Sequence, residues 1–157
     1  MSVIIQKASI VDLQTLYKIE QGCFTTEAFS KKQIASLLRA PNSVSLLANA
    51  SGEVAGFVIG LVYECDGIKI GHVVTVDVVP KYRRKGIGVK LLEKAEKEFK
   101  CKGVEICYLE VRADNVAAQE LYRKSGYVEV EWLEDYYCRG GHGIRLKKTL
   151  LSHGPEI

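Results

Sequence analysis

The sequence lacks any apolar run close to the roughly 20 residues that a membrane span requires, and no basic segment precedes its short apolar start. It also has little excess charge, because 22 Lys and Arg residues against 19 Asp and Glu residues leave a net charge of +3. That excess is too small for a surface built to bind nucleic acid, so any anion site has to be local. We expect a cytoplasmic protein that binds neither nucleic acid nor a membrane.

Thiol and metal motifs are also missing. The five cysteines form no Cys-x-x-Cys pair, and none of the three histidines lies beside a cysteine at metal-ligand spacing. A catalytic thiol would need a partner base, and no recognisable pattern supplies one. We expect reduced, mostly buried cysteines, no bound metal and no covalent enzyme intermediate.

Length and composition favour one domain. The chain has 157 residues, of which 47% are hydrophobic and 26% charged, and its mean hydropathy is +0.01. Such a chain can bury a core and leaves no room for a second full domain. We expect a single domain over residues 1–150, a loose tail over 151–157, and a monomer or weak homodimer.

Residue patterns predict an α/β layout. Ser9 with Asp12 and Ser30 with Gln33 are capping-box pairs that open two helices, after a first strand over residues 3–8. Further strands and helices follow from turn residues and periodicity. They are a three-stranded antiparallel meander over 43–79, a helix over 87–103, a strand over 104–111, a helix over 115–125, and strands over 127–133 and 143–150. The order is β-α-α-β-β-β-α-β-α-β-β, a mixed, mostly antiparallel sheet flanked by helices.

A local anion site is predicted at the start of the long helix. Residues 81–90 contain five basic residues, and Gly86 and Gly88 let backbone N–H groups approach a ligand closely. A purely structural alternative stays open, in which the glycines only allow a tight turn and the basic residues are only solvent-exposed surface residues. A dinucleotide fingerprint would need a third glycine in place of Leu91, and no Walker A loop is present.

Two segments carry a family resemblance. Arg83-x-x-Gly86-x-Gly88, after a strand that ends at residues 76–80, resembles the acetyl-coenzyme A (acetyl-CoA) signature of the GCN5-related N-acetyltransferase (GNAT) family. Residues 115–127, Asn-Val-Ala-Ala-Gln-Glu-Leu-Tyr-Arg-Lys-Ser-Gly-Tyr, resemble that family's second motif. The resemblance covers nearly the whole chain. Within the family it is closest to RimI-like and archaeal N-terminal protein acetyltransferases, through residues 109–112 and the Tyr136-Tyr137 pair.

The resemblance implies acetyl-CoA as cofactor. Backbone N–H groups from Arg84 to Val89 would hold the pyrophosphate, and the pantetheine arm would lie as a strand between the strands that begin at Ile68 and Val104. The Val78 N–H would donate to the thioester oxygen. The residues implied to bind the cofactor are Val76, Val78, Arg83, Arg84, Lys85, Gly86, Ile87, Gly88, Val89, Asn115 and Tyr122.

The resemblance also assigns catalytic residues, Glu110, Tyr122 and Val78. Glu110 is the candidate base, with a pKa that we expect its site to raise, and Tyr122 is the candidate acid for the departing thiolate. Alternatives from the residues alone stay open: Glu110 as an outward strand residue paired with Arg112, and Tyr122 as a core aromatic. A protein α-amine, with a pKa of about 7.7 to 8.0, asks less of the base than a lysine at about 10.4.

The acceptor side is less defined. Phe24 and Glu27, in the loop over residues 22–29, and the pair Tyr136 and Tyr137 are the candidate substrate-binding residues. The two tyrosines either grip a peptide backbone or form a cross-strand aromatic pair. His72 is interpreted as a structural imidazole, and Trp132 with residues 140–143 as hairpin packing.

The sequence thus predicts direct acetyl transfer from acetyl-CoA to the N-terminal α-amine of a protein, such as a ribosomal protein. One alternative is acetylation of lysine side chains or of small amines such as polyamines. Another is a non-catalytic sensor of coenzyme A or a nucleotide. The acidic residues that an acidic acceptor site would use are Glu20, Glu27, Glu131, Glu134 and Asp135.

Overall fold

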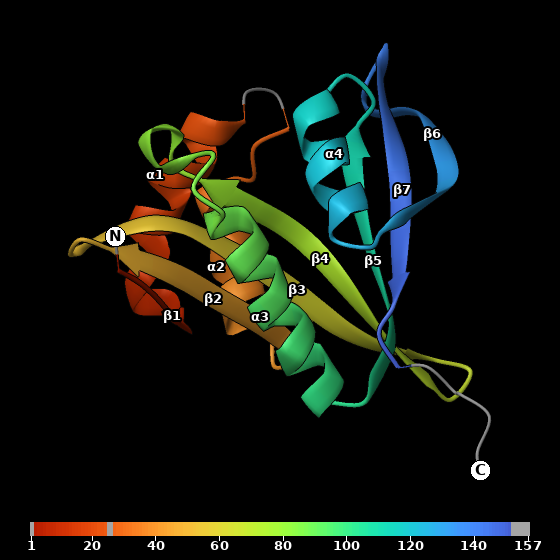
Figure 1. Ribbon diagram of the computed structural model, residues 1–157, viewed down its shortest axis with the longest axis horizontal. Helices are drawn as coiled ribbons and strands as arrows, with labels where there is room; N and C mark the ends of the chain where they lie inside the picture. Colours follow the sequence, from red (N-terminus) through yellow and green to blue (C-terminus); the bar gives the residue numbers. More distant parts are fainter. Residues whose placement is uncertain (1, 25–26, 152–157) are drawn as a thin grey trace.

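The computed structural model describes residues 2–24 and 27–151. Its seven strands form one sheet in the order β1-β2-β3-β4-β5-β7-β6, in which only β4 and β5 pair in parallel (Figure 1). The predicted order of elements is confirmed. The elements are β1 (Val3–Lys7), α1 (Leu13–Cys23), α2 (Lys31–Arg39), β2 (Ser43–Ala50), β3 (Glu53–Cys65), β4 (Ile68–Val78), α3 (Ile87–Cys101), β5 (Val104–Arg112), α4 (Val116–Lys124), β6 (Val128–Cys138) and β7 (Gly141–Thr149), with 3-10 turns at Ile10–Asp12 and Pro80–Tyr82.

Both predicted capping pairs are present. The Ser30 hydroxyl accepts the Gln33 N–H at 3.1 Å, and the Gln33 side chain accepts the Ser30 N–H at 2.8 Å, so α2 starts as expected. Asp12 likewise accepts the Ser9 N–H at 2.9 Å. This second pair opens a 3-10 turn, and α1 begins one turn later than predicted, because short 3-10 turns are common where α-helices start.

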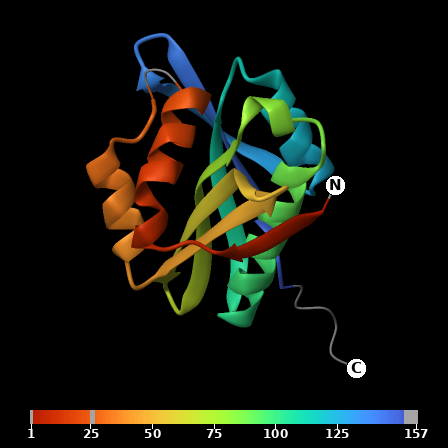
Figure 2. The ribbon, with the colours of Figure 1, turned by 90° about the vertical axis from the view of Figure 1, so that its left-hand side faces the viewer.

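Helices cover both faces of the first half of the sheet (Figure 2). On one face, α3 buries its apolar stripe, including Leu91 and Phe99, in the main core. On the other face, Leu16 of α1 and Ile34 of α2 pack against Phe57 of β3. Because α1 packs on β3 and β4, its last turn lies beside the end of β4, where Cys23 Sγ is 3.5 Å from the Val78 carbonyl oxygen.

Two sequence expectations need correction. The cysteines are not mostly buried: all five are free, Cys107 is buried, and Cys65, Cys101 and Cys138 are exposed. The last hairpin is also longer than predicted, since β6 continues to Cys138 and β7 begins at Gly141. Gly140, with φ of 78°, allows the tight turn between them.

In the described part of the chain, no helix has the length and apolarity needed to cross a membrane. Of the expected tail, residues 152–157 lie outside the described residues.

Candidate active site

A cleft opens in the sheet where β4 and β5 diverge. Their parallel pairing runs from Lys69 opposite Val104 to Val73 opposite Leu109 and then stops. Beyond that point β5 pairs only with β7, through Arg112 opposite Gly143. The last five residues of β4 therefore have a neighbour on one side only, which confirms the predicted separation of the two strands.

The main chain at the end of β4 is directed into this cleft. The Val79 N–H donates to the Ala55 carbonyl of β3 at 2.8 Å, and Asp77 lies opposite Phe57. Successive strand residues direct their N–H and C=O groups to opposite sides. Val76 and Val78 therefore point theirs away from β3, toward the gap left by β5, as a strand-like ligand requires.

The predicted anion cradle lies at the start of α3. Gly86 caps the helix with φ of 77°, and Arg84 adopts φ of 62°, which is unusual for a residue with a side chain. The first turn of a helix leaves backbone N–H groups without helical partners. A Cβ added at Gly88 would meet Leu121 and Val78 only at ordinary contact distances of 3.5 and 3.6 Å. Packing within the protein thus does not demand glycine there.

Arg83 is placed differently from its neighbours in the motif. Its Nε donates to the Val78 carbonyl at 3.1 Å, and its Nη2 lies 3.6 Å from the Cys23 Sγ. The guanidinium therefore ties the end of β4 to the last turn of α1. Arg83 itself is exposed, as are Arg84 and Lys85 beside the start of α3.

A cavity of about 270 Å³ occupies the cleft. It reaches α4 on one side of the sheet and the loop between α1 and α2 on the other. Two of the three predicted catalytic residues and all four predicted acceptor residues line it, together with two further residues that are predicted to bind the cofactor. The predicted residues in its lining are Phe24, Glu27, Val76, Glu110, Asn115, Tyr122, Tyr136 and Tyr137, whereas Val78 and residues 83–89 lie outside it.

Glu110 is held by partners from two neighbouring strands. Its Oε1 lies 2.6 Å from His72 Nε2, and its Oε2 accepts from Arg145 Nε at 3.1 Å. Burial alone would raise the pKa of Glu110, but the hydrogen bonds and charges of His72 and Arg145 outweigh it, so the pKa is lowered. The expected rise was wrong. The alternative partner, Arg112, instead contacts Asp114 and Glu27.

His72 and Arg145 belong to the site although the sequence did not predict them, and the interpretation of His72 as only a structural imidazole needs correction. His72 lies opposite Tyr108 in the parallel register, on the face of the sheet from which Glu110 also projects, and it lines the cavity. No local motif marks it, because its partner is 38 positions away and on another strand. Only the register of β4 on β5 brings the two together.

Tyr122 and Asn115 come from the second family motif. Tyr122, on α4, lines the cavity, and burial, followed by the nearby Asp77, raises the pKa of its phenol to about 12. Its ring also contacts Tyr127 edge-on, with centroids 6.1 Å apart. Asn115 caps α4, since its Oδ1 accepts the Ala118 N–H at 3.1 Å. This cap fixes the start of the helix that carries Tyr122.

The predicted acceptor residues come from the loop after α1, at Phe24 and Glu27, and from β6, at Tyr136 and Tyr137. Glu27 pairs with Arg112 of β5 at 3.4 Å, and the Arg112 guanidinium lies 5.6 Å from the centre of the Tyr137 ring. The rings of Tyr136 and Tyr137 meet edge-on, with centroids 4.9 Å apart. Both tyrosines line the cavity, so their contact and their place at the site coexist.

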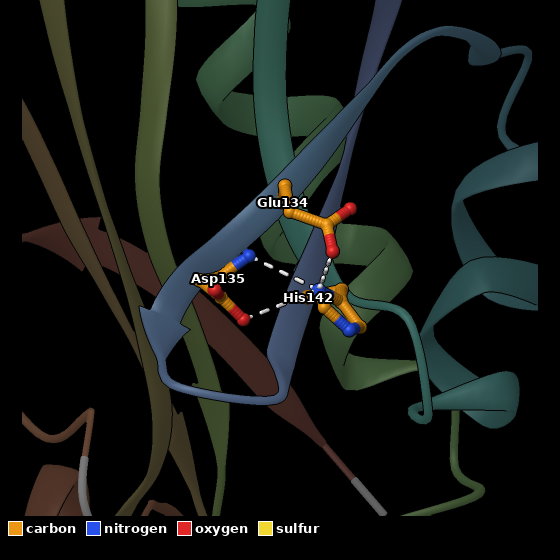
Figure 3. Close-up of side chains that lie close together, drawn as sticks. All are labelled: Glu134, Asp135 and His142. Carbon is orange, nitrogen blue, oxygen red and sulfur yellow. Dashed lines mark hydrogen bonds and ion pairs between the residues drawn. The ribbon is translucent and has the colours of Figure 1, made fainter.

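The hairpin also carries a cluster of Glu134, Asp135 and His142, whose ligand-type atoms lie within 4.8 Å of one another (Figure 3). His142 Nδ1 already accepts the Asp135 N–H at 3.0 Å, and the Glu134 side chain accepts the Trp132 indole N–H at 2.9 Å. Asp135 in turn accepts the Gly140 N–H at 2.7 Å. These bonds brace the hairpin and agree with the interpretation of Trp132 and residues 140–143 as hairpin packing.

Comparison with known proteins agrees with this geometry. The profile of the "Acetyltransferase (GNAT) family" matches residues 13–127. An N-alpha-acetyltransferase of Sulfurisphaera tokodaii is 32% identical over 145 residues, covering 87% of this chain and 86% of that protein. The structure of the ribosomal-protein-S18-alanine N-acetyltransferase from Escherichia coli superimposes with a TM-score of 0.86 at 28% identity, covering 99% of each chain. The PaiA N-acetyltransferase of Thermoplasma acidophilum, in complex with coenzyme A, gives a TM-score of 0.75 at 25% identity, covering 95% of this chain and 99% of that one. With its divided sheet, its glycine cradle and a family match over most of its length, the chain belongs to the GNAT family of acetyltransferases.

Proposed function

We propose that this enzyme acetylates the N-terminal α-amine of proteins, with acetyl-CoA as donor. The observation that carries the proposal is the single cavity that joins the cofactor side of the sheet to the His72–Glu110 pair on the acceptor side. The relatives support the choice of amine, since N-alpha-acetyltransferases and a ribosomal-protein N-acetyltransferase are among them.

Main-chain groups would hold the cofactor. Val76 and Val78 would pair with its pantetheine arm, and the N–H groups of residues 84–89 would bind its pyrophosphate, with Arg84 and Lys85 adding positive charge. Bound acetyl-CoA supplies the activated acetyl group. The Val78 N–H would donate to the thioester oxygen, a role in which loss of one donor typically raises the barrier by about 2.7 to 4 kcal/mol.

The His72–Glu110 pair would take the proton of the acceptor ammonium. Both carboxylate oxygens of Glu110 are engaged and its pKa is lowered, so Glu110 alone is a weak base. When Nε2 of His72 donates its proton to Glu110, Nδ1 is left as the free basic nitrogen. We therefore assign His72 as the proton acceptor, directly or through a water, and Glu110 as the group that orients it. Tyr122 would return a proton to the departing sulfur.

The cysteines bear on the compartment in which the enzyme works. The five free cysteines suit a reducing compartment, which supports the cytoplasm.

Release of free coenzyme A thiol tests the acceptor. The assay uses peptides that differ in their first two residues, with N-acetyl-blocked copies that contain an internal lysine. We expect turnover on free N-termini only. Turnover confined to blocked lysine peptides or to polyamines would overturn the α-amine assignment, and tight binding of acetyl-CoA without turnover on any amine would favour a sensor.

The base is tested by His72→Gln and Glu110→Gln, with Glu93→Gln on the exposed side of α3 as a matched control. At saturating acceptor, both site variants should have a lower kcat at pH 7 and recover part of it above pH 9, where the acceptor amine is already neutral. A uniform loss across pH would mean that the pair only positions the substrate.

A further inference from the structure

Two buried carboxyl groups contact the same hydroxyl beside the segment from Glu27 to Phe29, which we call the acceptor wall. Thr75 Oγ1, on β4, lies 2.5 Å from Asp77 Oδ1 and 3.2 Å from Oε1 of Glu20, which projects from α1. Glu20 and Asp77 are each only 1% exposed. Among the described residues, Asp77 Oδ2 has no hydrogen-bond partner. This arrangement has no part in the chemistry proposed above.

The contacts require one proton beyond that of the hydroxyl. The Thr75 hydroxyl can donate only once. If it donates to Glu20, its close contact with Asp77 has to be a bond donated by a protonated Asp77, and the reverse holds if it donates to Asp77. Glu20 Oε2 also accepts the Phe29 N–H at 3.0 Å, which favours the anion on Glu20. The extra proton therefore belongs to Asp77.

The surroundings of Asp77 agree with this assignment. Burial, followed by the proximity and charge of the Glu20 carboxyl group, raises the pKa of Asp77 to about 9. The other titratable or charged groups that face it are Cys23 from α1, Tyr122 from α4 and Arg83. Arg83 is the only cation among them, and its guanidinium is engaged with Val78 and Cys23. It offsets the effect of burial only in part.

Glu20 also holds the acceptor wall. It accepts the Phe29 N–H, while the next residue, Gln21, donates through Nε2 to the Phe29 carbonyl at 3.0 Å. Both Phe29 and Glu20 line the cavity. At its other end the wall is attached to β5 through Glu27 and Arg112. The position of Phe29 over β4 thus depends on the bond between Glu20 and Thr75.

We propose that the hydrogen-bonded series Asp77–Thr75–Glu20 holds one proton and thereby fixes the acceptor wall against β4. Loss of that proton puts two buried negative charges on one hydroxyl, so Glu20 moves away and the Phe29 segment loosens. Acceptor binding then weakens at alkaline pH, while cofactor binding on the other side of the sheet is unchanged. The kinetic part of this proposal rests on the proposed α-amine acetylation.

The experiment follows acceptor KM, the Kd of acetyl-CoA and the NMR exchange protection of the Phe29 amide between pH 8 and pH 10. One pH unit above the pKa, about nine in ten molecules have lost the proton, so the wild-type acceptor KM should rise about tenfold over this range. The protection factor of Phe29 should fall in parallel. In D77N, whose amide can donate to Thr75 and does not titrate, both quantities should stay constant.

Thr75→Val and Thr75→Ser form the matched pair. T75V removes the shared hydroxyl and should lower Phe29 protection about fivefold or more already at pH 7, whereas T75S keeps the hydroxyl and should behave like the wild type. An equal rise in KM for the wild type and D77N, or unchanged Phe29 protection in T75V, would overturn the proposal. If no peptide is acetylated, the proposed function fails. The exchange of the Phe29 amide still decides whether the hydrogen bonds of Asp77, Thr75 and Glu20 hold the acceptor wall.

Discussion

Asp77→Asn should change how the stability of the protein depends on pH. In the folded chain Asp77 keeps its proton up to about pH 9, because burial and Glu20 raise its pKa. In the unfolded chain an aspartate releases its proton near a pKa of about 3.9. Between these values the folded state binds one more proton than the unfolded state, so the free energy of unfolding falls as pH rises.

The size of the effect follows from this proton count. One proton corresponds to about 1.36 kcal/mol per pH unit, so Asp77 removes about 2.7 kcal/mol of stability between pH 5 and pH 7. The contribution is complete below about pH 4 and is lost as pH rises toward 9. An asparagine of the same shape does not titrate. The stability of D77N relative to the wild type should therefore increase by about 2.7 kcal/mol over the same interval.

Urea unfolding at pH 5, 6, 7 and 8 measures this difference. The wild type, D77N and the control E93Q are compared. Glu93 is exposed on α3, so E93Q removes a carboxylate without changing Glu20 or Asp77. E93Q should follow the wild type at every pH. If D77N also runs parallel to the wild type from pH 5 to pH 8, Asp77 is ionised in the folded state, and the assignment of the proton is refuted.

Two further predictions concern the site. Arg145→Met removes a cation that lowers the pKa of Glu110, so the acidic limb of the kcat/KM profile should move to higher pH. R145K keeps the positive charge and should restore the limb in part. A limb that does not move would show that Arg145 has no influence on the base. Arg84→Glu should weaken acetyl-CoA binding, and the loss of affinity should be smaller at high salt. The same charge reversal at Lys94, on the exposed side of α3, should have little effect. Equal losses of affinity at both positions would contradict a local phosphate site.

Local patterns were sufficient for the order of elements and for the glycine-containing turn before α3. Capping pairs, turn residues and strand periodicity depend on neighbours within a few positions, which is why the pair of Ser30 and Gln33 and the order of the elements were confirmed. The glycine cradle is local too, since Gly86 and the start of α3 are contiguous. The exposure of three cysteines was not predictable in the same way, because it depends on which surfaces the other elements cover.

The sequence by itself therefore determined the order of elements, the family and the glycine-containing start of α3, since each rests on spacing along the chain. Tertiary structure alone decided the chemistry of the acceptor side. His72, Glu110 and Arg145 come from β4, β5 and β7, and Glu20 meets Asp77 only because α1 packs across β4. The pKa of a carboxyl group depends on which charges lie within a few ångströms and on how much water remains, and strand register with helix packing sets both.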